Sequence, residues 1–200
     1  MTSPAVLATY DDSVALVVVD VQNDFADPAG GLYVPGGEQV LPRVNLEVER
    51  AVSAGATVVC TQDWHPPQTP HFAKDGGTWP VHCVGGTWGA ELHPDLVAGG
   101  ERLHKGTGGE DGYSAFTVRD PSSGVEQPTG LTELLRAGRV CSVVVVGLAT
   151  DYCVKETALD AVRLGFATTV LADAVRAVEL QPGDGRAALE AMEAAGVTIG

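Results

Sequence analysis

The sequence predicts an α/β fold, in which a doubly wound, mostly parallel six-stranded sheet carries helices on both faces. Runs of β-branched residues alternate with runs whose apolar residues recur at helical spacing, and this alternation is typical of parallel βαβ units. The four consecutive valines at 143–146 favour a strand buried inside such a sheet. A chain of 200 residues fits one domain, so we expect a single domain over residues 1–200.

Each expected strand is a short, mainly apolar run. In chain order the strands are Ser13–Val19, Ala56–Thr61, Glu101–His104, Cys141–Val146, Ala167–Leu171 and Val197–Ile199. Each expected helix has apolar residues three or four positions apart and a glycine that follows it. In chain order the helices are Glu38–Ala54, Leu131–Ala137, Asp151–Leu164 and Gly185–Ala195.

Two segments break this alternation. The segment Asp63–Gly100 is rich in Pro, Gly, His and Trp, and the segment Gly106–Gly130 is rich in Gly, Ser and Asp. Long irregular segments are uncommon in compact domains and are often functional. We therefore expect functional residues in and beside these two segments.

The charge distribution argues against two classes of partner. The formal net charge is −14 and the 12 basic residues form no cluster, which disfavours nucleic acid and anionic membrane surfaces. The sequence holds no apolar run of about 18 residues, the length that spans a bilayer. The first residues also lack the basic start and apolar run of a secretory signal. We expect a cytoplasmic protein, and the sequence leaves the choice between monomer and homo-oligomer open.

None of the four cysteines belongs to a C-x-x-C motif, so a zinc ribbon or a thioredoxin-like site is not indicated. Cys60 and Cys141 lie in apolar runs, where we expect core residues. Cys83 and Cys153 have polar, motif-like neighbours. In a cytosolic protein we expect no disulfides.

Cys153 follows the strand that contains the four valines. Gly147 is predicted to end that strand, and Asp151 is predicted to cap a helix that begins near Cys153. A thiol at a helix N-terminus has a lowered pKa, and open α/β sheets bind ligands at this edge. Cys153 is therefore a candidate nucleophile, although a small hydrophobic cysteine packed on the sheet is the commoner role.

Two charged residues also stand at strand ends. Asp20 follows an apolar strand, where burial would raise its pKa and suit it to general base catalysis. Lys105 ends the short third strand, and an ammonium group there would favour a thiolate nearby. Taken singly, a turn aspartate and a solvated lysine are the simpler interpretations. Asp24 lies past the strand end and fits a role in the turn.

Four residues of the first irregular segment form a candidate metal site. They are Asp63, His65, His71 and His82, and they begin directly after a strand. Three imidazoles and one carboxylate suit a borderline divalent metal such as Zn, Fe, Mn or Ni. Chance clustering of loop histidines is the alternative. His93 and His104 are weaker candidates, because one precedes a proline and the other lies within a strand.

Aromatic residues accompany these motifs and are candidates for the walls of a pocket that binds a flat ligand. They are Phe25, Trp64, Trp79, Trp88 and Tyr113. Aromatic residues can equally fill the interior of a long loop.

In order, the chain carries D-V-Q-N-D-F, Q-D-W-H-P, H-F, W-P-V-H-C-V, H-K-G and G-L-A-T-D-Y-C-V. With these motifs the chain resembles the nicotinamidases (pyrazinamidases) of the isochorismatase-like cysteine hydrolase superfamily. The resemblance runs from about Val17 to Asp173. It implies an isochorismatase-like fold and an amidase that converts nicotinamide to nicotinate and ammonia in NAD salvage, with pyrazinamide as a further substrate.

The resemblance also implies residue roles. Cys153 would be the nucleophile, Asp20 the general base and Lys105 the supporting cation. The candidate metal site would hold one divalent ion, Zn or Fe with Mn as a third candidate, facing the ring nitrogen of the substrate. The ligands would be Asp63, His65, His71 and His82.

The same resemblance implies a cis peptide bond between Leu148 and Ala149. The backbone N–H groups of Ala149 and Cys153 would then form an oxyanion hole. Phe25 and Trp79 would sandwich the substrate ring, with Tyr113 in the same pocket. Tyr152 stands where some relatives carry His. We assign no role to residues 110 and 111 of the loop before Tyr113.

Three alternatives remain. A superfamily hydrolase that acts on a ureido or carbamoyl amide would share the three catalytic residues but would not need the metal site. An isochorismatase, which cleaves a vinyl ether, would lack the nucleophilic cysteine. A catalytically silent metal-binding scaffold is the alternative that is not an enzyme.

Overall fold

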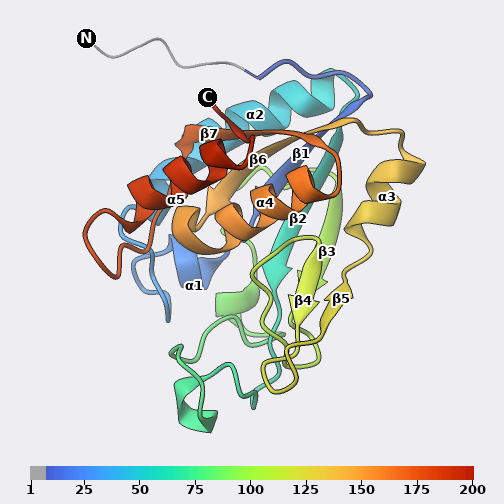
Figure 1. The fold of residues 1–200 in the computed structure, drawn as a ribbon. Helices are drawn as coiled ribbons and strands as arrows, with labels where there is room; N and C mark the ends of the chain where they lie inside the picture. The colour runs from blue at the N-terminus through green and yellow to red at the C-terminus, as the bar shows by residue number, and fades with distance from the viewer. Residues whose placement is uncertain (1–7) are drawn as a thin grey trace.

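A parallel six-stranded sheet organises residues 8–200, which the computed structural model describes, and its strand order is β3-β2-β1-β6-β7-β8 (Figure 1). Its strands are β1 (Val14–Val19), β2 (Thr57–Asp63), β3 (Glu101–Lys105), β6 (Ser142–Leu148), β7 (Ala167–Arg176) and β8 (Thr198–Ile199). Every neighbouring pair is parallel. The predicted doubly wound sheet is confirmed. Residues 1–7, where the sequence suggested no secretory signal, lie outside the described residues.

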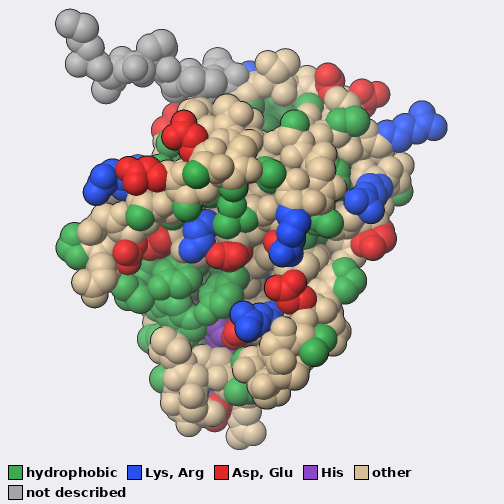
Figure 2. All heavy atoms as spheres, in the orientation of Figure 1, with side chains coloured by type: hydrophobic (Ala, Val, Ile, Leu, Met, Phe, Trp, Pro, Cys, Tyr) green, Lys and Arg blue, Asp and Glu red, His purple; other side chains and the backbone are tan. Residues whose placement is uncertain are grey.

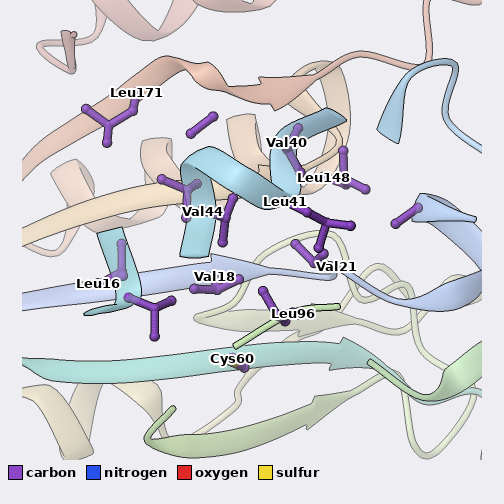
Figure 3. Close-up of a cluster of buried hydrophobic side chains, with 14 of the residues drawn as sticks. Leu16, Val18, Val21, Val40, Leu41, Val44, Cys60, Leu96, Leu148 and Leu171 are labelled. Atoms are coloured by element: carbon purple, nitrogen blue, oxygen red, sulfur yellow. The ribbon is translucent and has the colours of Figure 1, made fainter. Parts of the chain in front are cut away.

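Helices cover both faces of the sheet. One face carries α2 (Leu41–Ser53), and the other carries α3 (Leu131–Ala137), α4 (Lys155–Arg163) and α5 (Asp184–Ala194). Buried on both sides, β1 sends Leu16 and Val18 toward α2, while Ala15 and Val17 point to the opposite core. Figure 3 shows the first of these cores, in which Val44 of α2 packs above β1.

Several element boundaries differ from the prediction. Strand β6 continues through Gly147 to Leu148. Glycine is required at position 147, because its φ is +110° and an added Cβ would meet the Val19 carbonyl oxygen at 2.1 Å. The helix expected from Glu38 begins as a 3₁₀ turn, η1 (Gly37–Val40). The α-helix α2 follows from Leu41, with Pro42 in its first turn.

The structure contains short elements that the sequence did not indicate, most of them in the two irregular segments. Helix α1 (Asn23–Ala26) follows β1, and the 3₁₀ turns η2 (Ala73–Asp75) and η3 (Trp88–Ala90) interrupt the first segment. The second segment contains an antiparallel hairpin of β4 (Thr117–Arg119) and β5 (Glu126–Pro128). Both segments lie beyond the carboxyl ends of β2 and β3, in the lower part of Figure 1.

The cysteines follow the sequence prediction with one exception. Cys60 is buried in the core beside α2, and Cys83 is buried as well. The expectation that Cys141 is a core residue is wrong, because Cys141 precedes β6 at the amino edge of the sheet and is exposed. Among residues 8–200, no helix is both long and apolar enough to cross a bilayer.

Candidate active site

The sheet register brings the first two charged groups together. Asp63 and Lys105 are the last residues of β2 and β3 and are direct partners in the parallel pairing of these strands. Lys105 Nζ lies 2.6 Å from Asp63 Oδ1 and 2.7 Å from Asp20 Oδ2, at the end of β1. All three side chains are buried. One ammonium group thus bridges two carboxylates at the carboxyl edge of the sheet.

Neighbouring polar side chains hold the two carboxylates in place. Thr61 donates its hydroxyl to Asp20 Oδ1 at 2.7 Å and accepts the Asp20 N–H at 3.2 Å. Asp20 has a φ of +49°, a conformation that aspartate tolerates better than most residues. The Gln22 amide bonds both the N–H and the carbonyl of Asp63, each at 2.8 Å. The positions of both carboxylates are therefore set by buried hydrogen bonds.

Cys153 enters the same cluster from the turn that follows β6. The Leu148–Ala149 peptide bond is cis, as the family resemblance implies, and the π-helical turn η4 (Thr150–Val154) comes next. Cys153 Sγ lies 3.8 Å from Lys105 Nζ. The thiol and the carboxylates of Asp20 and Asp63 have ligand atoms within 4.8 Å of one another.

Asp151 does not cap the helix, in contrast to the sequence prediction. It lies inside η4, whose preceding residue is Ala149. Its two carboxylate oxygens accept the backbone N–H groups of Val178 at 2.9 Å and Glu179 at 3.0 Å. Asp151 therefore ties the turn that carries Cys153 to the loop between β7 and α5.

The charges of the cluster follow from burial and proximity. Burial would lower the pKa of Lys105, but the carboxylates of Asp20 and Asp63 raise this pKa well above its usual value. Burial would raise the pKa of Asp63, but Lys105 and nearby histidines bring this pKa well below its usual value. The pKa of Asp20 is raised, because burial outweighs the attraction of Lys105. Asp63 therefore serves as the counter-ion of Lys105, and Asp20 is the carboxyl group with the greater tendency to bind a proton.

The thiol departs from the sequence prediction. Burial raises the pKa of Cys153 well above its usual value, Lys105 opposes this rise, and the carboxylate of Asp20 adds to it. The expectation of a thiol pKa lowered by a helix N-terminus and a lysine is therefore wrong for this arrangement. The thiol is neutral at rest and needs a base to remove its proton.

The three predicted histidine ligands meet beside this cluster. One ring nitrogen from each of His65, His71 and His82 lies within 4.8 Å of the others. Asp63 Oδ2 lies 3.7 Å from His65 Nε2 and 3.9 Å from His82 Nε2. Asp63 thus faces Lys105 with one oxygen and the histidines with the other.

The chemistry of these residues fits a divalent metal. The two ring nitrogens of His65 are buried and have no hydrogen-bond partner among the described residues, which is costly unless a further group binds there. His82 Nδ1 bonds the Pro80 carbonyl at 2.8 Å, which leaves Nε2 to face Asp63. Burial lowers the pKa of His82 to about 4, so its ring is neutral near pH 7, as a ligand must be.

His93 and His104 lie outside this group. His104 stacks on Trp64 with ring centroids 4.1 Å apart, and His93 Nδ1 accepts the N–H of Asp95. The structure therefore separates the three clustered histidines from the two that the sequence ranked as weaker candidates.

A narrow, mainly apolar pocket leads to the thiol. Its aromatic walls are Phe25, Trp79, Tyr113 and Tyr152. The same pocket is lined by Cys153, Ala149, Asp63, His71 and His82. Hydrophobic side chains gather beside a histidine on the face shown in Figure 2. The other two aromatic candidates lie elsewhere, since Trp64 stacks on His104 and Trp88 is 52% exposed.

Comparisons with known proteins agree with this geometry. A model of the isochorismatase domain matches residues 14–200. The chain belongs to the isochorismatase family. Within this family it is similar to the nicotinamidase of Escherichia coli (strain K12), with 39% identity over 203 residues that cover 92% of this chain and 93% of that protein.

Solved structures of isochorismatase-like proteins share the fold. The pyrazinamidase of Pyrococcus horikoshii in complex with zinc has a TM-score of 0.83 and 39% identity, covering 94% of this chain and 98% of that one. PnC1 from L. infantum in complex with nicotinate has a TM-score of 0.85 and 37% identity, covering 97% of this chain and 96% of that one. The resemblance inferred from the sequence motifs is confirmed.

Sequence reasoning missed several residues of this isochorismatase-family site. Thr61 lies two residues before Asp63 in a strand, where residues two apart share a face. Gln22 lies two residues after Asp20, within the D-V-Q-N-D-F motif. The positions of both residues therefore gave a usable signal. Asp111 bonds His71, and the Gly112 carbonyl accepts a hydrogen bond from Lys105. Nothing in the spacing of that loop indicates either contact.

Proposed function

We propose that this protein is a nicotinamidase, a metal-assisted cysteine amidohydrolase that converts nicotinamide to nicotinate and ammonia in NAD salvage, and that pyrazinamide is a further substrate. The observation that carries this proposal is a shared pocket. The thiol of Cys153 and the histidine cluster face the same narrow cavity, whose aromatic walls suit a flat ring.

The first half of the reaction makes a thioester. Asp20 takes the proton of the Cys153 thiol, and the Lys105 ammonium 3.8 Å from Sγ stabilises the thiolate as it forms. The thiolate attacks the carboxamide carbon. Backbone N–H groups of Ala149 and Cys153 stabilise the oxyanion. Asp20 returns the proton to the leaving nitrogen, so ammonia departs and the acyl group stays on sulfur.

The second half returns the enzyme to its resting state. Asp20 takes a proton from a water molecule, whose oxygen attacks the thioester carbon. The C–S bond breaks, Asp20 passes its proton to the sulfur, and the product leaves as nicotinic acid, which releases its own proton to solvent and becomes nicotinate. The raised pKa of Asp20 suits this alternation between base and acid. Lys105 keeps its charge throughout, because two carboxylates surround it.

Asp63, His65, His71 and His82 would hold one divalent metal ion, for which zinc and iron are the leading candidates and manganese the third. When bound, the ion supplies a Lewis acid that attracts a ring nitrogen and so orients the substrate. Phe25 and Trp79 hold the ring from its sides, and the hydroxyl of Tyr113 fixes Trp79 by accepting its indole N–H at 2.7 Å.

The similar proteins described above support this proposal. The bacterial relative is a nicotinamidase, one solved neighbour contains zinc and another contains nicotinate. The cytoplasmic location and the single domain stay predictions.

The test is ammonia release from nicotinamide by the purified protein, alongside Cys153→Ala, protein stripped by a chelator and Cys141→Ala. Cys141 is exposed and distant from the pocket, so its variant controls for loss of any cysteine. We expect release by the intact protein and Cys141→Ala, and none by Cys153→Ala or stripped protein. Absence of release from metal-loaded intact protein would overturn the proposal and direct the assay to ureido and carbamoyl amides.

A further inference from the structure

The three consecutive residues 111–113 touch three different parts of the site. The Asp111 carboxylate lies 2.6 Å from His71 Nδ1. The Gly112 carbonyl accepts a hydrogen bond from Lys105 Nζ. The Tyr113 hydroxyl accepts the indole N–H of Trp79. One short stretch of the second irregular segment therefore contacts a metal-ligand candidate, the cationic residue and a pocket wall.

The hairpin of β4 and β5 anchors residues 111–113. Asp111 and Arg119 of β4 form two backbone hydrogen bonds, at 2.8 and 2.9 Å. The backbone also runs close to the site at Gly112, where a Cβ would meet Asp63 Oδ1 at 3.0 Å and Lys105 Cγ at 3.3 Å. Only glycine fits there without displacing these groups. The position of Asp111 is therefore fixed from both sides.

His71 differs from the other two histidines because a side-chain carboxylate, that of Asp111, bonds its ring. Nδ1 of His82 is held by the backbone carbonyl of Pro80, and the buried His65 ring has aromatic neighbours but no hydrogen-bond partner among the described residues. His71 and Asp111 also line a second cavity of about 240 Å³. Aromatic neighbours pack on the His71 ring, but the Asp111 carboxylate is the group among the described side chains that hydrogen-bonds it, so the direction of its ring nitrogens rests on that bond.

We propose that Asp111 is a positioning residue for the metal, acting through His71. This inference rests on the proposed function, because it assumes that His71 binds the ion. The carboxylate accepts the Nδ1–H of His71, which directs Nε2 toward the other ligands and makes that nitrogen a better donor. Removal of such a carboxylate typically lowers metal affinity by roughly 10- to 100-fold.

The test measures zinc affinity directly, by competition with a chromophoric chelator in the absence of substrate. We expect Asp111→Ala to bind zinc about 10- to 100-fold more weakly than the unaltered protein. Asp111→Asn keeps an acceptor oxygen for His71 but loses the charge, so its affinity should fall between the two. Glu110→Ala is the matched control, because it removes a carboxylate one residue away that accepts the N–H of Gly108 within its own turn.

The outcomes separate this inference from the proposed function. Unaltered protein that binds none of zinc, iron(II) and manganese(II) would overturn the metal-assisted function itself. Unaltered protein that binds zinc, with an Asp111→Ala dissociation constant within twofold of it, would overturn only the role of Asp111. The same loss in Glu110→Ala as in Asp111→Ala would also overturn it, because a general charge effect would then be the cause. Thermal melting of each metal-free variant verifies that the compared proteins are folded.

Discussion

Thr61 acts on the protonation of Asp20, although it does not touch the thiol. Its hydroxyl donates to Asp20 Oδ1 and lowers a pKa that burial raises. A general base must be deprotonated, so kcat/KM should fall as the pH drops through the raised pKa of Asp20. Loss of a hydrogen bond to a charged group costs roughly 1.5 kcal/mol, about one pKa unit. We expect Thr61→Val to move the acid limb of the pH profile upward by about one unit.

The control for this prediction is Thr157→Val. Thr157 is also fully buried, and its hydroxyl accepts the N–H of Ala115, remote from Asp20. Loss of the Thr157 hydroxyl should destabilise the protein without moving the acid limb of the kcat/KM profile. An acid limb that stays in place in Thr61→Val would show that Asp20 does not govern this part of the profile.

Lys105 also stabilises the folded protein, and urea unfolding measures this contribution independently of activity. In metal-free protein, Lys105→Met would leave Asp20 and Asp63 buried with no ammonium between them. Removal of one partner of a buried ion pair costs roughly 3–5 kcal/mol of unfolding free energy. Adding Asp20→Asn should recover part of this loss, since one of the two unpaired carboxylates disappears.

Lys155→Met serves as the comparison, because Lys155 is partly exposed and its ammonium group lies 3.4 Å from the neighbouring carboxylate of Glu156. Its unfolding free energy should change by less than about 0.5 kcal/mol. Equal losses for Lys105→Met and Lys155→Met would contradict the charge arrangement described for the cluster.

At the scale of single residues, the sequence indicated which side chains the fold brings together, but it did not indicate their energetics. Asp20 follows β1, Lys105 ends β3 and Cys153 lies in the turn after β6, so the common carboxyl edge of a parallel sheet brings them together. The thiol pKa was predicted in the wrong direction because the sequence does not give the depth of burial. The position of Thr61, two residues before Asp63, was a usable signal, but its partner Asp20 lies 41 positions away and became evident only from the structure.

Among the elements, the turn η4 and the loop after β7 act as a unit through Asp151. Its carboxylate accepts two backbone N–H groups, one of them from Val178, which lines the pocket. Asp151→Ala should lower the unfolding free energy by roughly 1.5–3 kcal/mol, the contribution of hydrogen bonds to a charged group. It should also lower kcat, because the oxyanion turn and a pocket wall lose their link.

Asp120→Ala is the matched variant for this prediction. Asp120 likewise accepts backbone N–H groups, from Ser122 and Ser123, but it lies in the exposed turn of the hairpin. The kcat of Asp120→Ala for ammonia release should stay unchanged. If Asp151→Ala keeps full kcat, the link between η4 and the pocket has no part in catalysis.

The elements that the sequence missed share a physical cause. The strands β4 and β5 have three residues each and are largely exposed, so no apolar alternation marks them. Turn η4 differs from an α-helix in hydrogen-bond pattern, which apolar spacing does not report. In contrast, the buried strands β1 and β6 consist almost entirely of apolar residues, and their positions were predicted closely.

For the molecule as a whole, metal binding should appear as added stability. A ligand that binds only the folded state at 100 times its dissociation constant contributes about 2.7 kcal/mol. For a chain of this size, we expect zinc to raise the melting temperature by roughly 5–10 °C. Differential scanning calorimetry with and without a chelator measures the shift.

Cys153→Ala provides the control at this scale, because it lacks the nucleophile and keeps all four ligand candidates. It should show the same zinc-dependent shift as the unaltered protein. A melting temperature that does not respond to zinc in either protein would mean that the histidine cluster does not bind the metal in the folded state.

The architecture of the whole chain was the most predictable feature. Six strand runs alternate with helical runs, and this alternation leaves few topologies for a parallel sheet. The arrangement of the two irregular segments could not be predicted in the same way. Their contacts, such as that between Asp111 and His71, join residues 40 positions apart without any periodic pattern.

Strand β3 carries one further implication. It lies at the edge of the sheet and is largely exposed, yet its last residue is the fully buried Lys105. Side chains alternate between the faces of a strand, so a single inserted or deleted residue would turn the ammonium away from Asp20 and Asp63. Residue count is therefore more tightly constrained than residue type in β3. Many substitutions at its exposed positions should be tolerated, whereas a change of length by one residue should not.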